Sequence, residues 1–169
     1  IMEPLPVDRL VAALPAARAA AREDGWLDAA RAIMTTDTVP KGASRRVTID
    51  GVPVTVTGIA KGAGMIHPDM ATMLAFLTTD VAISPAALQA ALKTAVDVSF
   101  NCLTVDSDTS TSDQCLILAS GAAGNAELSE ASPAFVDALT HVCVHLAREI
   151  ARDGEGATKL VTVRVLGGP

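Results

Sequence analysis

Two serine-proline pairs, Ser84-Pro85 and Ser132-Pro133, constrain the fold of this chain more than any other feature. A serine that caps a helix accepts a hydrogen bond from a backbone N–H of the first turn. Proline suits the first helical position because its missing N–H would have no partner there. Each pair therefore predicts the start of a helix, the first running to about residue 99 and the second to about residue 152. Both helices separate segments with strand character, which favours a layered α/β arrangement in which helices enclose sheets.

The remaining elements follow from hydrophobic periodicity and turn residues. Apolar residues spaced along one helix face predict a helix over 7–23, which Pro15 should kink or split, and a second, short helix over 26–34. Alternation of valine or isoleucine with polar residues on both sides of Asp50-Gly51 predicts a β-hairpin over 46–59. Further strands are expected near 72–77, 102–105, 114–119 and 160–165.

Composition narrows the class of protein. The 169 residues suit one domain or a large part of one, half of them are apolar, and only 2% are aromatic. The net charge of −6 and the scarcity of aromatic rings argue against a nucleic-acid-binding protein, which needs a basic surface. Neither a membrane span nor a secretory signal is visible in the sequence. These properties indicate a protein that acts on small polar substrates.

The three cysteines are Cys102, Cys115 and Cys143, and none lies close enough in sequence to another to suggest a zinc site. The first two lie in strand-like stretches and the third in a helix-like stretch. We interpret all three as buried, reduced thiols, which are typical of a cytoplasmic protein.

The segment that leads to Thr72 carries the strongest chemical signal. Two glycines, a proline and a small residue, Ala71, precede the threonine, and an apolar stretch follows it. A flexible loop that ends in a threonine is what a self-cleaving N-terminal nucleophile requires. Cleavage of the Ala71–Thr72 bond would give Thr72 a free α-amine, and this amine could act as the base that activates the hydroxyl.

Other motifs give weaker signals. Lys61 precedes the glycines of its loop, whereas a phosphate-binding loop has its lysine after them, so the loop is either a plain turn or a place where Lys61 approaches a carboxylate. The acidic run from Asp106 lacks the glycine and glutamate of a calcium loop and is better read as a solvated or internally hydrogen-bonded loop. His141 and His145 stand four apart, which suits either zinc binding or an amphipathic helix. A Ser/His/Asp triad stays open, but no serine lies in a nucleophile elbow.

Several segments taken together resemble the ornithine acetyltransferase family, the glutamate N-acetyltransferases of arginine biosynthesis. The matching motifs cover nearly the whole chain in order, and their combination is far more specific than any one of them. They lie at 4–8, 32–38, 61–80, 100–106, 109–113 and 155–159.

The resemblance implies an αββα sandwich, of which this chain would be a part, and a precursor that cuts itself at Ala71–Thr72. It implies that Thr72 accepts an acetyl group from N-acetylornithine, releases ornithine and passes the acetyl group to glutamate. By the same resemblance, Thr35 and Lys61 bind substrate and Glu155 faces its amino group. The physical roles suit these residue types, since Lys61 can hold a carboxylate and Glu155 can pair with an ammonium.

The resemblance also sets expectations for domains and partners. Residues 1–169 would be the central part of a single ornithine acetyltransferase-like domain, with 1–71 ending the α segment and 72–169 starting the β segment. These segments of one precursor would stay together and assemble into a homo-oligomer in the cytoplasm, without nucleic acid or membrane. No cofactor or metal is implied, while acetyl-CoA stays open as a further acetyl donor.

Two departures from the family pattern affect the expected activity. The Thr-Gly pair that forms the family's oxyanion hole, and the family's C-terminal substrate-binding residues, would lie outside residues 1–169, and Met2 stands where glycine is expected. The chain by itself should therefore be inactive. Two alternatives to the acetyltransferase remain, a related self-processing hydrolase or aminopeptidase that gives the acyl group to water, and a non-catalytic fragment.

Overall fold

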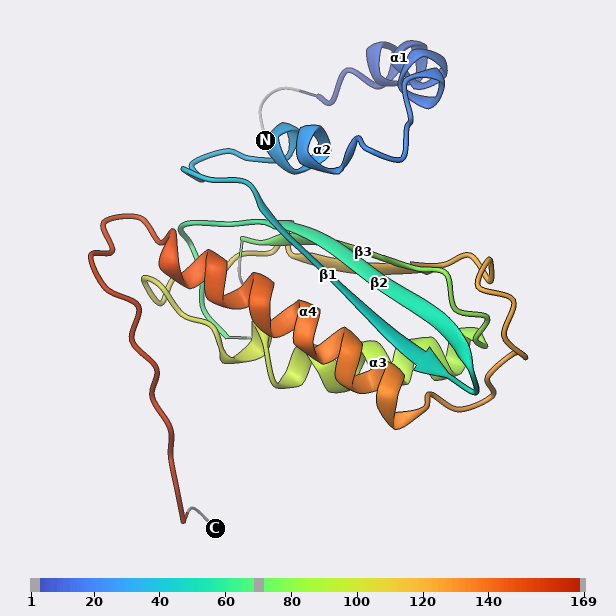
Figure 1. Ribbon diagram of the computed structural model, residues 1–169. Coiled ribbons are helices and arrows are strands. Elements are labelled where there is room, and N and C mark those ends of the chain that lie inside the picture. Colours follow the sequence, from blue (N-terminus) through green and yellow to red (C-terminus); the bar gives the residue numbers. More distant parts are fainter. Residues whose placement is uncertain (1–3, 69–71, 168–169) are drawn as a thin grey trace.

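The computed structural model describes residues 4–68 and 72–167 and shows one mixed sheet with helices on its faces (Figure 1). The expected mixed α/β class is confirmed, and the arrangement is consistent with part of an α/β sandwich. In chain order the elements are α1 (Val7–Ala19), α2 (Trp26–Ala32), β1 (Lys41–Ile49), β2 (Val52–Lys61), β3 (Leu74–Thr79), α3 (Pro85–Asp97), the 3₁₀ turn η1 (Phe100–Cys102), β4 (Gln114–Ala119) and α4 (Pro133–Arg152).

The strands form a sheet in the order β1-β2-β3-β4. The first three are antiparallel neighbours, whereas β3 and β4 are parallel and are joined through α3. The register places Lys61, the last residue of β2, opposite Leu74, the first residue of β3. The loop between these two strands therefore begins and ends at the same end of the strands, which brings Lys61 and Thr72 to the same end of the molecule.

Helices α3 and α4 pack side by side against one face of the sheet and enclose the core (Figure 1). Eight residues of α4 are buried, including Phe135, Leu139, Leu146 and Ile150. Gly58 permits the close approach of this helix, because a Cβ there would lie 2.3 Å from Leu77 Cδ2 and 3.2 Å from Leu146 Cδ1. The last turn of α4 ends beside the start of β1, where Lys41 Nζ contacts Asp153 Oδ2 at 2.6 Å.

The two serine-proline helix starts are confirmed. Ser84 Oγ accepts a hydrogen bond from Ala87 N, and Ser132 Oγ accepts one from Phe135 N, with proline following each serine. The hairpin is confirmed as well and is longer than expected, since β1 and β2 together extend from residue 41 to 61. Asp50 and Gly51 both have positive φ, 49° and 82°, as a tight hairpin turn of the I′ type requires.

Some expectations are wrong. Helix α1 is not split at Pro15 but continues through it to Ala19, while the expected kink stays a prediction. The strand expected at 102–105 is replaced by η1 and a loop, and residues 160–165 form no strand among the described residues. Cys102 is exposed rather than buried, while Cys115 is partly buried and Cys143 buried. Within the described residues, no helix is both long and apolar enough to cross a membrane.

Candidate functional site

The loop from Gly62 to Pro68 is the centre of the candidate site, since its backbone contacts three separate segments. Met65 O accepts a hydrogen bond of 2.7 Å from Thr72 N, Ala63 O accepts one of 2.7 Å from Glu155 N, and Ile66 O accepts one of 3.0 Å from Val105 N. The nucleophile candidate and the candidate acidic residue are therefore both held by the same short loop.

Thr72 lies just before β3, and its hydroxyl is buried. Among the described residues, its Oγ1 is the buried side-chain oxygen without a hydrogen-bond partner. Buried hydroxyls in folded proteins are nearly always paired, so an exception calls for an explanation such as a catalytic role. The neighbouring Ala71, on the other side of the expected cleavage point, lies outside the described residues.

Lys61 is a buried cation, 7% exposed, at the end of β2. Its Nζ lies 3.4 Å from Thr35 Oγ1, so the structure brings together two of the residues predicted to bind substrate. No carboxylate of the described residues lies within ion-pair distance of this ammonium. Because burying a charge is costly unless it is paired, Lys61 is well suited to receive an anionic ligand group.

Glu155 follows α4, and its carboxylate lies directly against the backbone of Gly64. A Cβ built on Gly64 would come within 2.8 Å of Glu155 Oε2 and 2.9 Å of Glu155 Cδ. Only a residue without a side chain at position 64 leaves this carboxylate where it is.

Replacing Gly64 by alanine should therefore displace the Glu155 carboxylate while leaving the fold intact, because the clash involves the flexible end of a side chain. If Glu155 binds substrate, as the family resemblance implies, the acetyl transfer expected of the complete protein should fall by roughly tenfold or more, the effect of a misplaced binding group. Steady-state kinetics combined with thermal unfolding would measure both effects.

Gly42→Ala is the matched control, since a Cβ there would meet only ordinary contacts, at 3.7 Å from Ile59 Cγ2. Equal activity in the two alanine variants would contradict the importance of the Gly64–Glu155 contact.

A buried group of charges lies beside the site and was not recognised as such from the sequence. Lys41 Nζ contacts Asp37 Oδ1 at 2.7 Å and Asp153 Oδ2 at 2.6 Å. The side chains of Lys41 and Asp37 are fully buried, and that of Asp153 is 5% exposed. Asp37 was visible only as part of a threonine-rich stretch. Lys41 lies in the strand that follows and Asp153 at the end of α4, so only the fold brings the three charges together.

Asp106 fixes the loop ahead of Thr72. Its carboxylate accepts hydrogen bonds from Met65 N at 2.6 Å and Ile66 N at 2.9 Å, which holds Met65 at a positive φ of 56°. Desolvation would raise the pKa of Asp106, but the bonds from Ile66 and Met65 outweigh it and lower the pKa. Asp106 also accepts a bond of 3.2 Å from Asp108 N, in keeping with an internally hydrogen-bonded loop rather than a calcium site.

The other sequence motifs do not converge on this site. Within the described residues, no group of three or more His, Cys, Asp or Glu side chains could hold a metal ion, and His141 and His145 lie along α4. Burial raises the pKa of Cys115 to about 11 and that of Cys143 to about 12, so neither is a reactive thiolate at neutral pH.

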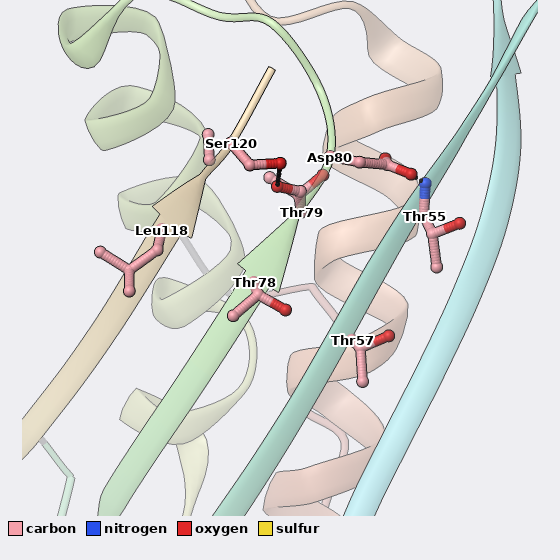
Figure 2. Close-up of a pocket in the computed structure, with 8 residues that line it drawn as sticks. Thr55, Thr57, Thr78, Thr79, Asp80, Leu118 and Ser120 are labelled. Atoms are coloured by element: carbon pink, nitrogen blue, oxygen red, sulfur yellow. Dashed lines mark hydrogen bonds between the residues drawn. The ribbon is translucent and has the colours of Figure 1, made fainter. Parts of the chain in front are cut away.

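A polar hollow of 340 Å³ lies at the opposite end of β3 from Thr72 (Figure 2). Its polar groups are already paired in part, because Asp80 Oδ1 accepts a bond of 2.7 Å from Thr55 N and Ser120 Oγ donates one of 3.4 Å to Thr79 O. None of the residues predicted to bind substrate lines this hollow.

The chain is similar to known proteins over its whole length. The model of the ArgJ family matches residues 1–169. An arginine biosynthesis bifunctional protein ArgJ from Symbiobacterium thermophilum is 59% identical over 97% of this chain and 42% of the relative. The protein of the same name from Gluconobacter oxydans is 55% identical over 99% of this chain and 40% of the relative. The chain thus spans about two fifths of the length of these curated relatives.

A crystal structure of the arginine biosynthesis bifunctional protein ArgJ from Bacillus halodurans is 47% identical to the chain. The similarity covers 48% of this chain and 39% of that one, with a TM-score of 0.45. The match of the family model to every residue, together with two relatives above 50% identity over nearly the whole chain, establishes that the chain belongs to the ArgJ family.

Proposed function

We propose that this chain carries the nucleophile and part of the substrate site of an enzyme that transfers an acetyl group from N-acetylornithine to glutamate. The observation that carries the proposal is the position of Thr72. Its hydroxyl is buried without a partner among the described residues, and its backbone N–H is held by the loop that follows Lys61 and contacts Glu155. Membership of the ArgJ family, whose named relatives act in arginine biosynthesis, supports the same reaction class.

The proposed reaction begins with hydrolysis of the Ala71–Thr72 bond, in which water adds to the Ala71 carbonyl and leaves a carboxylate on Ala71 and a free α-amine on Thr72. This amine accepts the proton of the Thr72 hydroxyl as the oxygen attacks the acetyl carbonyl of N-acetylornithine. Collapse of the tetrahedral intermediate breaks the C–N bond, the leaving nitrogen takes the proton, and ornithine departs. The amine of glutamate then attacks the acetyl-threonine ester, which yields N-acetylglutamate and restores the hydroxyl.

The charges of the site match the two ends of the proposed donor. In this proposal Lys61 and Thr35, whose Nζ and Oγ1 lie 3.4 Å apart, hold the α-carboxylate, and Glu155 pairs with the side-chain ammonium. The tetrahedral intermediate needs hydrogen-bond donors for its oxyanion, and removing one such donor costs roughly 10²–10³ in rate in a known hydrolase. We propose that the Thr-Gly pair of the family, outside residues 1–169, supplies these donors.

The complete enzyme would consist of the α and β segments of one precursor, 1–71 ending the first and 72–169 starting the second, assembled as a homo-oligomer in the cytoplasm. No metal or cofactor enters the proposed reaction. Acetyl-CoA stays open as a second acetyl donor, and acetylation of glutamate from acetyl-CoA by the complete enzyme would show this.

The test uses the complete protein, at the full length of its relatives, and N-acetylornithine labelled in the acetyl group. We expect label to appear in N-acetylglutamate when glutamate is present and little label to be released as acetate, because the ester is protected until an amine attacks it. Label appearing mainly as acetate, with or without glutamate, would instead indicate a self-processing hydrolase. Absence of any labelled product and of chain cleavage would indicate a non-catalytic protein.

A further inference from the structure

We propose that Asp37, Lys41 and Asp153 are positioning residues that set the distance between the two charged ends of the substrate site. The inference rests on the proposed function, since it concerns the carboxylate-binding side at Lys61 and the ammonium-binding side at Glu155. The name "charge cluster" is used below for Asp37, Lys41 and Asp153.

The charge cluster is a built structure rather than a surface ion pair. Lys41 Nζ lies 2.7 Å from Asp37 Oδ1, 2.6 Å from Asp153 Oδ2 and 3.3 Å from Val39 O, so all three of its N–H groups have an acceptor. Two carboxylates and one ammonium leave a formal charge of −1 in a buried place. Such a group is stable only if further donors compensate for the missing water.

Backbone N–H groups provide this compensation, and they belong to the loops that carry the site. Asp37 accepts bonds of 2.7 Å from Gly62 N and 3.2 Å from Thr35 N. Asp153 accepts a bond of 2.9 Å from Thr38 N and a further one from the Thr38 hydroxyl.

The pKa values of the two aspartates agree with this arrangement. Burial alone would raise the pKa of each carboxyl, but the hydrogen bonds from Gly62 and Lys41 to Asp37, and from Lys41 and Thr38 to Asp153, outweigh it and lower the pKa below the ordinary value. Both aspartates therefore stay ionised and keep accepting from the loops.

Asp37 connects the two residues predicted to hold the substrate carboxylate. One of its oxygens accepts from the N–H of Thr35, and the other accepts from the N–H of Gly62, which directly follows Lys61. The same carboxylate therefore fixes the separation of Thr35 and Lys61, whose side chains meet at 3.4 Å.

Asp153 connects this part of the site to Glu155. It caps the end of α4, and only Gly154 separates it from Glu155. Figure 1 shows the last turn of α4 at the same end of the sheet as the start of β1, where Lys41 lies. Because Lys41 bonds to both aspartates, the charge cluster joins the Lys61 side to the Glu155 side through one buried ammonium.

Two variants test the two connections separately. Asp37→Asn leaves the Lys41–Asp153 pair, and Asp153→Asn leaves the Lys41–Asp37 pair, each with no net charge. Asp37→Asn loses one acceptor oxygen, so its amide group must point at either Thr35 N or Gly62 N. Asp153→Asn loosens the loop that carries Glu155. Asp97→Asn is the matched control, because Asp97 lies in an exposed ion pair with Lys93 on α3, 2.6 Å apart, and its other side-chain partner is Asn101 Nδ2 at 3.2 Å, so its carboxylate bonds to no residue of the proposed site.

The experiment measures kcat and KM of the complete enzyme with two donors, N-acetylornithine and N-acetylnorvaline, which has the same chain length but no side-chain amine. For Asp153→Asn we expect the preference for N-acetylornithine, as the ratio of the two kcat/KM values, to fall by about tenfold or more. For Asp37→Asn we expect both donors to lose about tenfold or more through KM with the ratio unchanged. Asp97→Asn should match the wild type.

The ratio of the two donors is independent of the fraction of folded enzyme, because both are measured on the same preparation. A partly unfolded variant therefore cannot imitate the change expected of Asp153→Asn. Hydrogen exchange provides a second readout, with faster exchange expected at Thr35 or Gly62 in Asp37→Asn and at Thr38 in Asp153→Asn.

The proposal is overturned if both variants keep the wild-type ratio and KM values, or if the exchange rates at these amides do not change. A wild-type enzyme that fails to use N-acetylornithine would refute the proposed function and with it the substrate part of this inference. In that case the exchange rates still decide whether the charge cluster holds the loops together.

Discussion

Replacing Thr72 by alanine in the complete protein should leave a single uncut polypeptide and abolish acetyl transfer. The variant loses both the hydroxyl that would attack the peptide bond before it and the oxygen that would carry the acetyl group. In a serine protease, loss of the nucleophile costs roughly 10⁶ in kcat. Denaturing electrophoresis and intact mass would show whether cleavage occurs, and the labelled-acetyl assay would give the residual rate.

Two variants serve as controls for the Thr72 result. Thr72→Ser keeps a hydroxyl and should still be cut and still transfer acetyl groups, whereas Thr94→Ala changes an exposed threonine on α3 and should behave as the wild type. Because Thr72 Oγ1 has no hydrogen-bond partner among the described residues, removing it should cost little stability. Acetyl transfer by Thr72→Ala at a substantial rate would refute its role as the acetyl carrier.

Replacing Lys61 by methionine should lower kcat/KM for N-acetylornithine by roughly 10²–10³, chiefly through KM. Losing one partner of a desolvated, hydrogen-bonded charge pair costs about 2–5 kcal/mol, and each 1.4 kcal/mol is about tenfold. Methionine nearly preserves the volume and removes a buried ammonium that has no carboxylate partner among the described residues. The free energy of unfolding should therefore stay the same or increase.

The same substitution at Lys41 should have the opposite effect on stability. Lys41→Met would leave the carboxylates of Asp37 and Asp153 buried without their ammonium, a change that costs about 3–5 kcal/mol in comparable cases. Lys93→Met, in an exposed ion pair, should change neither stability nor activity appreciably. Denaturant unfolding and steady-state kinetics on the three variants would distinguish a ligand-binding lysine from a structural one. Equal destabilisation by Lys61→Met and Lys41→Met would contradict this distinction.

The local signals of the sequence predicted the elements well where short-range physics decides. Ser84 and Ser132 cap their helices as expected, because the cap requires only the residues of one helical turn. The turn at Asp50-Gly51 was equally secure, since positive φ at two successive residues favours these residue types.

The errors occurred where contacts with distant segments decide. An apolar alternating stretch such as 160–165 becomes a strand only if a neighbouring strand supplies its hydrogen bonds, and no described strand does so. The stretch near Cys102 forms η1 because the chain turns immediately after α3, with Cys102 N bonding to Ser99 O at 3.0 Å. Neither outcome can be read from residue types alone.

The candidate site shows the same difference between what local sequence signals predict and what contacts with distant segments decide. Thr72 was proposed from the loop that precedes it, and Thr35, Lys61 and Glu155 through motif resemblance. The structure brings Thr35 to Lys61 and ties the backbones of Glu155 and Thr72 to the same loop, 62–68. The roles of Asp37, Lys41, Asp153 and Asp106 were not recognised, since each acts by accepting or donating hydrogen bonds across large separations in sequence.

The sequence by itself determined the helix caps, the hairpin, the net negative charge and low aromatic content, and the family to which the nucleophile candidate belongs. Those features depend on neighbouring residues or on the order of motifs. The tertiary structure alone decided which of two lysines pairs with carboxylates of the described residues and which does not. Lys41 and Lys61 are both buried and both lie in the β1–β2 hairpin, but they face different partners. Lys41 Nζ contacts two carboxylates, one of them at the end of α4, whereas Lys61 Nζ contacts the Thr35 hydroxyl and, among the described residues, no carboxylate.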